Sequence, residues 1–280
     1  ALAIDGTFDD CQALVKAMFN DHRFRDEVAL SGVNSINWAR VAPQITYYFA
    51  AAVALGAPHR KISFAVPTGN FGDVFAGYVA KRMGLAIECL TVASNSNDIL
   101  PRTMATGIYE KRDVVATSSP SMDIQVSSNF ERYLFESQSR DASLIRAQMA
   151  SLGQSGKFEV RGGPSRLAED FMAGAASEQE VADCIRETRS QTGYLMEPHT
   201  ACGMIASRKR QSATSRTPEV VLATAHPAKF AEAMTDIVGA PTPLPARLSH
   251  LLSEPERVTQ LRNDVVEVQN YIRTATRANQ

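Results

Sequence analysis

Val66-Pro67-Thr68-Gly69-Asn70-Phe71-Gly72-Asp73 is the stretch that says most about the fold, because it joins a strand pattern to a helix pattern. Apolar residues alternate before it, over 62–66, and recur at helical spacing after it, over 74–79. The turn is therefore expected to form a helix N-terminus, where unpaired backbone N–H groups and the helix dipole favour a bound phosphate. Its glycines would let the backbone approach such an anion closely.

The turn departs from two familiar phosphate-binding motifs. No Gly-Lys-Ser or Gly-Lys-Thr follows it, as in a P-loop, and the second glycine of the dinucleotide motif G-x-G-x-x-G is missing. A structural alternative is that Asn70 caps the helix, with Asp73 in the reciprocal position of an imperfect capping box. The octet alone leaves both alternatives open.

Composition suits a soluble globular chain of one large or two modest domains, since 44% of the 280 residues are hydrophobic and 21% are charged. A formal charge of -1 gives no basic field for nucleic acid or an anionic membrane, so we expect neither as a partner. The longest apolar stretch, Ile45–Leu55, is too short to span a bilayer and lacks the basic leader of a signal peptide, which predicts a cytoplasmic protein. The four cysteines lack the spacing of a zinc site, and no metal is expected.

Residues 61–93 show the order strand, turn, helix, strand. Ile87–Val92 supplies the second strand, and Val220–Thr224 resembles a further buried strand. Such a βαβ unit predicts an α/β fold of three layers, a parallel sheet with helices on both faces. Ligands in such folds bind at the carboxyl ends of the strands, which is where the turn at 68–73 lies.

Several passages, in their order and spacing, resemble threonine synthase. They are Gly6–Cys11, Val33–Arg40, Pro67–Asp73, Ser119–Ile124, Ser127–Arg132, Glu197–Ala201 and Ala223–Phe230. An ordered set of this kind is far more specific than any one short motif. The resemblance covers almost the whole chain and is to the C-terminal portion of the family. It implies the tryptophan synthase β-like fold, fold type II, with the N-terminal part missing.

The resemblance implies an enzyme that converts O-phospho-L-homoserine and water to L-threonine and phosphate in threonine biosynthesis. Its cofactor would be pyridoxal 5'-phosphate, which serves as an electron sink. The family's cofactor-phosphate loop is matched by Gly69, Asn70, Phe71, Gly72 and Asp73.

Thr224 matches the family's hydroxyl residue beside the pyridine nitrogen, where a neutral partner would leave the ring weakly protonated. The alternative is an ordinary threonine in a buried strand. Asn34, Ser35 and Arg40 match family positions near the substrate phosphate, and a guanidinium with amide and hydroxyl donors suits a dianionic leaving group. The alternative is that Asn34 and Ser35 cap a helix while Arg40 forms a surface ion pair.

Other candidates are weaker. Glu197 and Thr200 occupy a family passage near the cofactor, but the passage also resembles a plain helix entry. His226 is a candidate proton relay, although a histidine beside a strand end is more often structural. Glu131 and Arg132 are expected to form a solvated pair.

Such an enzyme needs a Schiff-base lysine, and none of the seven lysines here stands in the family's Phe-Lys-Asp context. A second glycine-rich loop, of the type Ser-Gly-Asp-Thr-Gly, is also missing. We therefore expect no catalytic residue in this chain, with the lysine upstream of Ala1 in a missing N-terminal portion of the same protein. The chain alone is expected to be inactive.

Three parts are predicted. Residues 1–33 would be the remainder of a small cofactor-fold domain, 34–238 a large PLP-binding domain with a family-specific insertion around 111–175, and 239–280 a C-terminal tail with a packing helix. Two alternative functions remain: a lysine-free module that binds phosphate or PLP without turnover, and a related PLP-dependent phospho-lyase.

Overall fold

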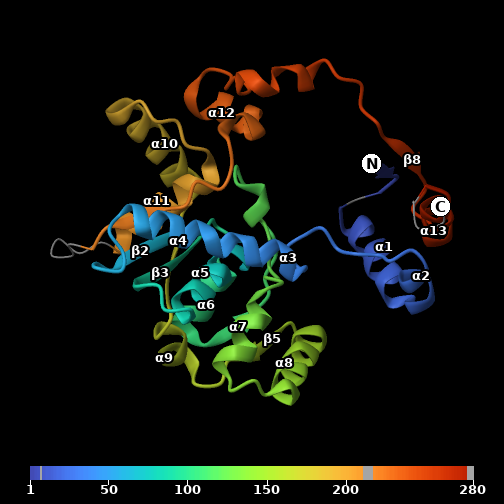
Figure 1. Ribbon diagram of the computed structural model, residues 1–280, viewed down its shortest axis with the longest axis horizontal. Helices are drawn as coiled ribbons and strands as arrows, with labels where there is room; N and C mark the ends of the chain where they lie inside the picture. The colour runs from blue at the N-terminus through green and yellow to red at the C-terminus, as the bar shows by residue number, and fades with distance from the viewer. Residues whose placement is uncertain (7, 211–216, 276–280) are drawn as a thin grey trace. The chain divides into compact units, whose positions relative to one another are not determined.

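The computed structural model describes residues 1–6, 8–210 and 217–275, and the chain divides into two compact units (Figure 1). One unit joins Ala1–Val33 with Leu244–Gln280, and the other is Asn34–Pro243. The three-part division made from the sequence stays a prediction. Thr7, which belongs to one of the family passages, lies outside the described residues.

A four-stranded parallel sheet forms the centre of the unit Asn34–Pro243. Its strand order is β6 (Phe171–Ala175), β3 (Ile87–Ser94), β2 (Ile62–Pro67) and β7 (Glu219–Val221). Every residue of β2 is buried, as expected for a central strand covered on both faces. The predicted βαβ unit is confirmed, with α5 (Gly72–Arg82) between β2 and β3.

Helices cover both faces of this sheet, which confirms the predicted layers. α4 (Ile45–Ala54) packs on one face, where the ring of Tyr48 lies 4.9 Å from that of Phe64. α11 (Pro198–Arg210) packs on the opposite face, because Gly203 there lies against Pro67 and Val221. A side chain at Gly203 would come within 2.9 Å of Val221, so glycine permits this close approach.

The remaining elements of this unit surround the sheet (Figure 1). They are α3 (Trp38–Val41), a 3-10 turn (Ala42–Gln44), α6 (Ile99–Thr106), β4 (Ile108–Glu110), a 3-10 turn (Pro120–Met122), α7 (Phe130–Ser137), α8 (Ala142–Ser155), β5 (Lys157–Glu159), α9 (Gly163–Ala168), α10 (Glu178–Thr192), a 3-10 turn (Pro227–Phe230) and α12 (Ala231–Val238). β4 and β5 pair in antiparallel fashion. The segment around 111–175, expected as an insertion, ends in β6 and so supplies a strand of the central sheet.

The unit of Ala1–Val33 and Leu244–Gln280 is built from both ends of the sequence. β1 (Leu2–Ile4) pairs in parallel with β8 (Thr259–Leu261). α1 (Phe8–Asn20), α2 (His22–Glu27), a 3-10 turn (Ala246–Leu252) and α13 (Val265–Ala275) complete it. Phe24 is fully buried in its core, and the predicted closing helix, α13, packs against α1.

Within the described ranges no helix is both long and apolar enough to cross a membrane. The same residues contain no cluster of three or more histidine, cysteine, aspartate or glutamate side chains arranged for a metal ion.

Candidate functional site

The predicted turn lies between β2 and α5, and Phe71 is the residue whose backbone conformation sets its shape. Phe71 precedes α5 in the left-handed conformation, with φ of 61°, and no side chain caps the helix there. The proposed capping box of Asn70 and Asp73 is therefore wrong. Asp73 instead accepts a hydrogen bond from the buried hydroxyl of Tyr48, at 3.1 Å.

An aromatic cluster holds Phe71 in this conformation. Its side chain is 1% exposed, and its ring lies 5.2 Å from Phe130 and 5.3 Å from Phe171. A bulky residue in the left-handed region costs on the order of 1–3 kcal/mol, which burial of an aromatic ring offsets. The turn is thus a fixed part of the fold.

A cavity of about 160 Å³ opens at this turn, lined by Ser35, Gln44 and residues 67–74. None of the described residues accepts a hydrogen bond from the backbone N–H groups of residues 69–73. These donors stand at the N-terminus of α5, where the helix dipole adds positive potential. The arrangement suits a bound anion such as a phosphate group.

The carbonyl groups of the turn, in contrast, have partners. Ser127 Oγ donates to Gly69 O at 2.7 Å, and the backbone N and Nδ2 of Asn129 donate to Asn70 O at 3.1 and 3.0 Å. A Cβ at Gly69 would lie 2.5 Å from the carbonyl oxygen of Ser121, so only glycine fits here. Residues 119–129 therefore hold the carbonyl side of the turn and leave its N–H groups for a ligand.

Asp73 gives the cavity its acidic group. Burial raises the pKa of its carboxyl to about 6, although the hydrogen bond from Tyr48 opposes the rise. The charge at this edge of the cavity therefore changes near neutral pH.

Ser35 lines the cavity, and its role in anion binding stays a prediction. Asn34 and Arg40 are exposed and do not line it. Their substrate-phosphate role stays a prediction, but the capping and ion-pair alternative is wrong: Asn37 caps α3, and Arg40 forms no ion pair with any described carboxylate. The structure thus brings one of the three predicted substrate-phosphate residues to the turn.

Thr224 lies in the loop that follows β7, three residues after the strand ends at Val221, and it is exposed. Because Val221 pairs with Ala65 of the parallel strand β2, Thr224 stands at the same edge of the sheet as the turn. It is not among the residues lining the cavity. His226 caps the next 3-10 turn, its Nδ1 accepting from the N–H of Ala228 at 3.2 Å.

Glu197 and His199 form a buried pair near the turn. Glu197 is 0% exposed, and its carboxylate accepts from the N–H and hydroxyl of Thr200 at 2.8 and 2.7 Å. His199 Nε2 accepts from the N–H of Ser121 at 3.2 Å, which leaves the proton on Nδ1, 2.6 Å from Glu197. Burial would raise the pKa of Glu197, but its hydrogen bonds with His199 and Thr200 outweigh burial and lower it.

These contacts connect α11 to the turn through Ser121, whose carbonyl packs on Gly69. No role for Ser119–Ile124 could be predicted from sequence, because its partners are far away along the chain. Asn95, at the end of β3, donates from Nδ2 to Ser119 Oγ at 2.9 Å and to Asp123 Oδ1 at 2.7 Å. The passage is thus a support for the turn.

Lysine side chains do not line this cavity. Six of the seven are exposed, and Lys81 is half-buried with its Nζ 3.8 Å from Asp170. A catalytic lysine outside these residues stays a prediction.

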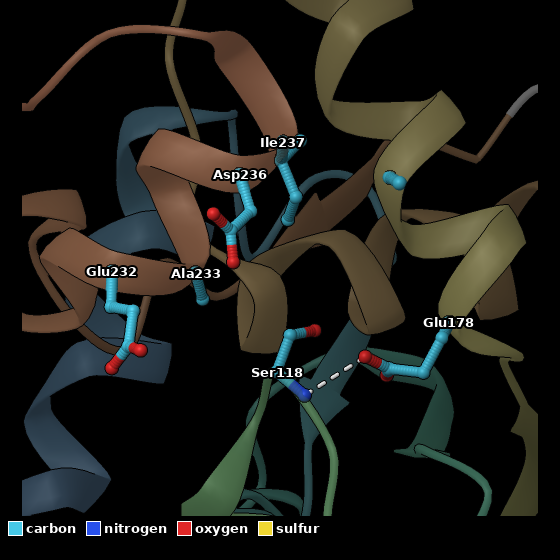
Figure 2. A pocket seen from close by; sticks show the side chains of 7 residues that line it. Ser118, Glu178, Glu232, Ala233, Asp236 and Ile237 are labelled. Atoms are coloured by element: carbon cyan, nitrogen blue, oxygen red, sulfur yellow. Dashed lines mark hydrogen bonds between the residues drawn. The ribbon is translucent and has the colours of Figure 1, made fainter.

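A larger cavity, of about 370 Å³, lies between α10, α12 and the loop before the Pro120–Met122 turn (Figure 2). The carboxylates of Glu178, Glu232 and Asp236 line it, and Glu178 accepts from the N–H of Ser118 at 2.9 Å. Three carboxylates repel a phosphate dianion, so the smaller cavity is the candidate anion site.

Comparisons with known proteins agree with this fold. Residues 200–272 match the family described as "Threonine synthase, C-terminal". Threonine synthase of Pseudomonas aeruginosa is 46% identical over 97% of this chain, and the match spans 58% of that protein. The PLP-bound threonine synthase of Brucella melitensis superposes with a TM-score of 0.93 at 54% identity, over 99% of this chain and 60% of that one.

The yeast threonine synthase structure matches with a TM-score of 0.84 at 37% identity, over 97% of this chain and 58% of that one. Nearly all of this chain is aligned with each of these relatives. The chain spans about three-fifths of the length of each relative. By sequence and by structure, the chain belongs to the threonine synthase family, whose C-terminal portion it matches.

Proposed function

We propose that this chain works in a PLP-dependent threonine synthase, a carbon-oxygen lyase that converts O-phospho-L-homoserine and water to L-threonine and phosphate. The observation that carries the proposal is the set of unpartnered N–H groups at residues 69–73, fixed at the start of α5 beside Ser35. Because the chain spans about three-fifths of the length of its relatives, we propose this activity for the whole protein and not for this chain alone.

Pyridoxal phosphate fits the residues present. The N–H groups of Gly69, Asn70, Phe71, Gly72 and Asp73 would hold its phosphate, and Thr224 would hold its pyridine nitrogen. When bound, the cofactor supplies an electron sink that stabilises negative charge beside the amino-acid nitrogen. The chain's own part is to bind and orient, through donors that are fixed before any ligand arrives.

The substrate's phosphate is a leaving group that carries two negative charges. Ser35 offers a hydroxyl donor from within the cavity, and Asn34 and Arg40 lie on the same segment. A guanidinium and neutral donors near the departing phosphate would stabilise the charge that develops as the C–O bond breaks. The groups that move protons at the reacting carbon are expected outside the described residues.

The first test is a product assay on the complete gene product with pyridoxal phosphate and O-phospho-L-homoserine. We expect threonine and phosphate in equal amounts. Phosphate with a keto acid would indicate a related phospho-lyase. Cofactor binding without phosphate release would indicate a binding module, and either result would refute the proposal.

Two variants separate the cofactor and substrate roles. Gly69→Ala places a methyl group against Ser121 and, since overpacking costs about 1–3 kcal/mol, should raise the Kd of pyridoxal phosphate about tenfold or more. Arg40→Ala removes one charged donor and should raise the KM of O-phospho-L-homoserine by about ten- to hundredfold with little change in cofactor Kd. Absorbance titration and steady-state kinetics measure both. Equal losses of cofactor and substrate in Arg40→Ala would contradict the substrate-phosphate role.

A further inference from the structure

Arg132, in the first turn of α7, contacts two segments that meet at the anion cavity. Its Nε donates to Asn129 Oδ1 at 2.9 Å, and its Nη2 donates to the carbonyl oxygen of Ile36 at 2.6 Å. The solvated pair expected for Glu131 and Arg132 is wrong, since no described carboxylate forms an ion pair with Arg132. Its hydrogen-bonding capacity goes to an amide and a backbone carbonyl instead.

The first contact leads to the turn. Asn129 is 0% exposed and uses its backbone N–H and Nδ2 on Asn70 O, at 3.1 and 3.0 Å. The hydrogen bond from Arg132 fixes which way the amide of Asn129 faces, with Oδ1 toward the arginine and Nδ2 toward the turn.

The second contact leads to the segment 34–41, which carries Ser35. Ile36 O accepts from Arg132, and the guanidinium carbon lies 6.0 Å from the ring centre of Trp38. The Trp38 ring in turn lies edge-on to Phe75 of α5, at 6.4 Å. Ser35, next to Ile36, lies opposite Gly72, where an added Cβ would be 3.4 Å from Ser35 Cβ.

We propose that Arg132 is a positioning residue that fixes the spacing between the turn at 68–73 and the segment 34–41. Ser35 and the backbone N–H groups of residues 69–73 are thereby held where they can bind the same anion. The inference deepens the proposed function and rests on it for the identity of the anion. The fixed fork of a guanidinium can donate in two directions at a set separation, whereas a lysine ammonium is a single charged point on a flexible stem. Charge alone would therefore not replace Arg132.

The test compares Arg132→Lys with Arg140→Lys in the complete gene product. Arg140 is a matched control because its guanidinium is exposed and, among the described residues, pairs with the half-buried Glu136 near the other end of α7. Arg132→Lys should raise the KM of O-phospho-L-homoserine about tenfold and change kcat by less than about threefold, while Arg140→Lys changes neither. A KM in Arg132→Lys equal to that of the control would overturn the inference.

A double-mutant cycle with Ser35→Ala separates positioning from general weakening. If Arg132 acts by placing Ser35, the loss from Ser35→Ala should be several-fold smaller in the Arg132→Lys background than in the unmodified protein. Losses that simply multiply would show that Arg132 acts independently of Ser35, against the inference.

Deuterium exchange needs no ligand and completes the test. Amides of residues 34–41 should exchange faster in Arg132→Lys than in Arg140→Lys, while those of β2 and β3 stay unchanged. Unchanged exchange at 34–41 would refute the positioning role. Faster exchange throughout the protein would show that Arg132→Lys misfolds, and Arg132→Gln would then be compared with Arg140→Lys in its place. If the unmodified protein releases no phosphate, the proposed function fails, and exchange alone decides the role of Arg132.

Discussion

Single residues at the turn do two things at once, and Asp73 is the clearest case. Its carboxyl lies in the first turn of α5, where the helix dipole favours negative charge, yet it also faces a cavity suited to an anion. Burial raises its pKa to about 6, so it is poised between the two charge states near neutral pH. Tyr48 donates to it and to its backbone carbonyl, which keeps the carboxyl in place in either state.

The raised pKa of Asp73 predicts a pH-dependent contribution to stability. A folded-state pKa above the ordinary value of 3.8 means that the folded protein binds the proton more tightly than the unfolded chain does. The stabilising contribution is complete below pH 3.8 and is lost as pH rises through about 6. Asp73→Asn should therefore be more stable than the unmodified protein at pH 8, by on the order of 2 kcal/mol, and gain little at pH 4.5.

Urea unfolding of the two proteins at both pH values measures this difference. Asp183→Asn, which removes an exposed carboxylate, is the control and should show no such trend. A stability difference for Asp73→Asn that stays constant from pH 4.5 to pH 8 would show that its carboxyl titrates normally.

Elements that support the turn come from distant parts of the sequence. The βαβ unit of residues 62–94 was predictable, because its apolar alternation and helical spacing are local signals. The contacts that support the turn were not predictable from sequence. They join residues that are distant along the chain and meet only in the folded protein, namely His199 with Ser121 and Arg132 with Ile36. Local patterns also misplaced the helix cap: Asn70 and Asp73 fit a capping box, but the aromatic cluster around Phe71 sets the turn differently.

The buried pair of Glu197 and His199 supports a prediction about α11. Glu197→Gln removes a fully buried charge that accepts two backbone N–H groups, a hydroxyl and an imidazole proton. We expect a loss of about 2–4 kcal/mol in the free energy of unfolding, together with weaker binding of pyridoxal phosphate as Ser121 loses its support. Glu187→Gln, which breaks the exposed pair with Arg208, should cost less than about 1 kcal/mol.

Urea unfolding and cofactor titration measure these effects. If Glu197→Gln proved as stable as Glu187→Gln and bound cofactor equally well, the pair would have no supporting role for the turn.

At the scale of the whole molecule, each of the two units has its own buried core. The smaller unit could not be predicted from sequence. β1 and β8 have three residues each, which is too short for an apolar alternation that would reveal their pairing. Its core includes Phe24, which is fully buried and whose ring lies under the guanidinium of Arg273, at 5.0 Å.

Phe24→Ala tests whether this core stabilises both of its segments. Removing a buried phenylalanine costs about 3–5 kcal/mol. We expect faster deuterium exchange in 1–33 and in 244–275 together, read peptide by peptide by mass spectrometry, while β2 and β3 stay protected. Faster exchange in 1–33 alone would mean that the two segments do not share one cooperative core.

The pairing of β1 with β8 also has a consequence for synthesis on the ribosome. Leu2 pairs with Thr259, so about 250 residues must be translated between the two strands of this sheet. At roughly 5–20 residues per second, Leu2–Ile4 waits on the order of 10–50 s for its partner strand. During that time the residues of the larger unit can emerge and fold, so the smaller unit is completed after the larger one although its first strand is made before it.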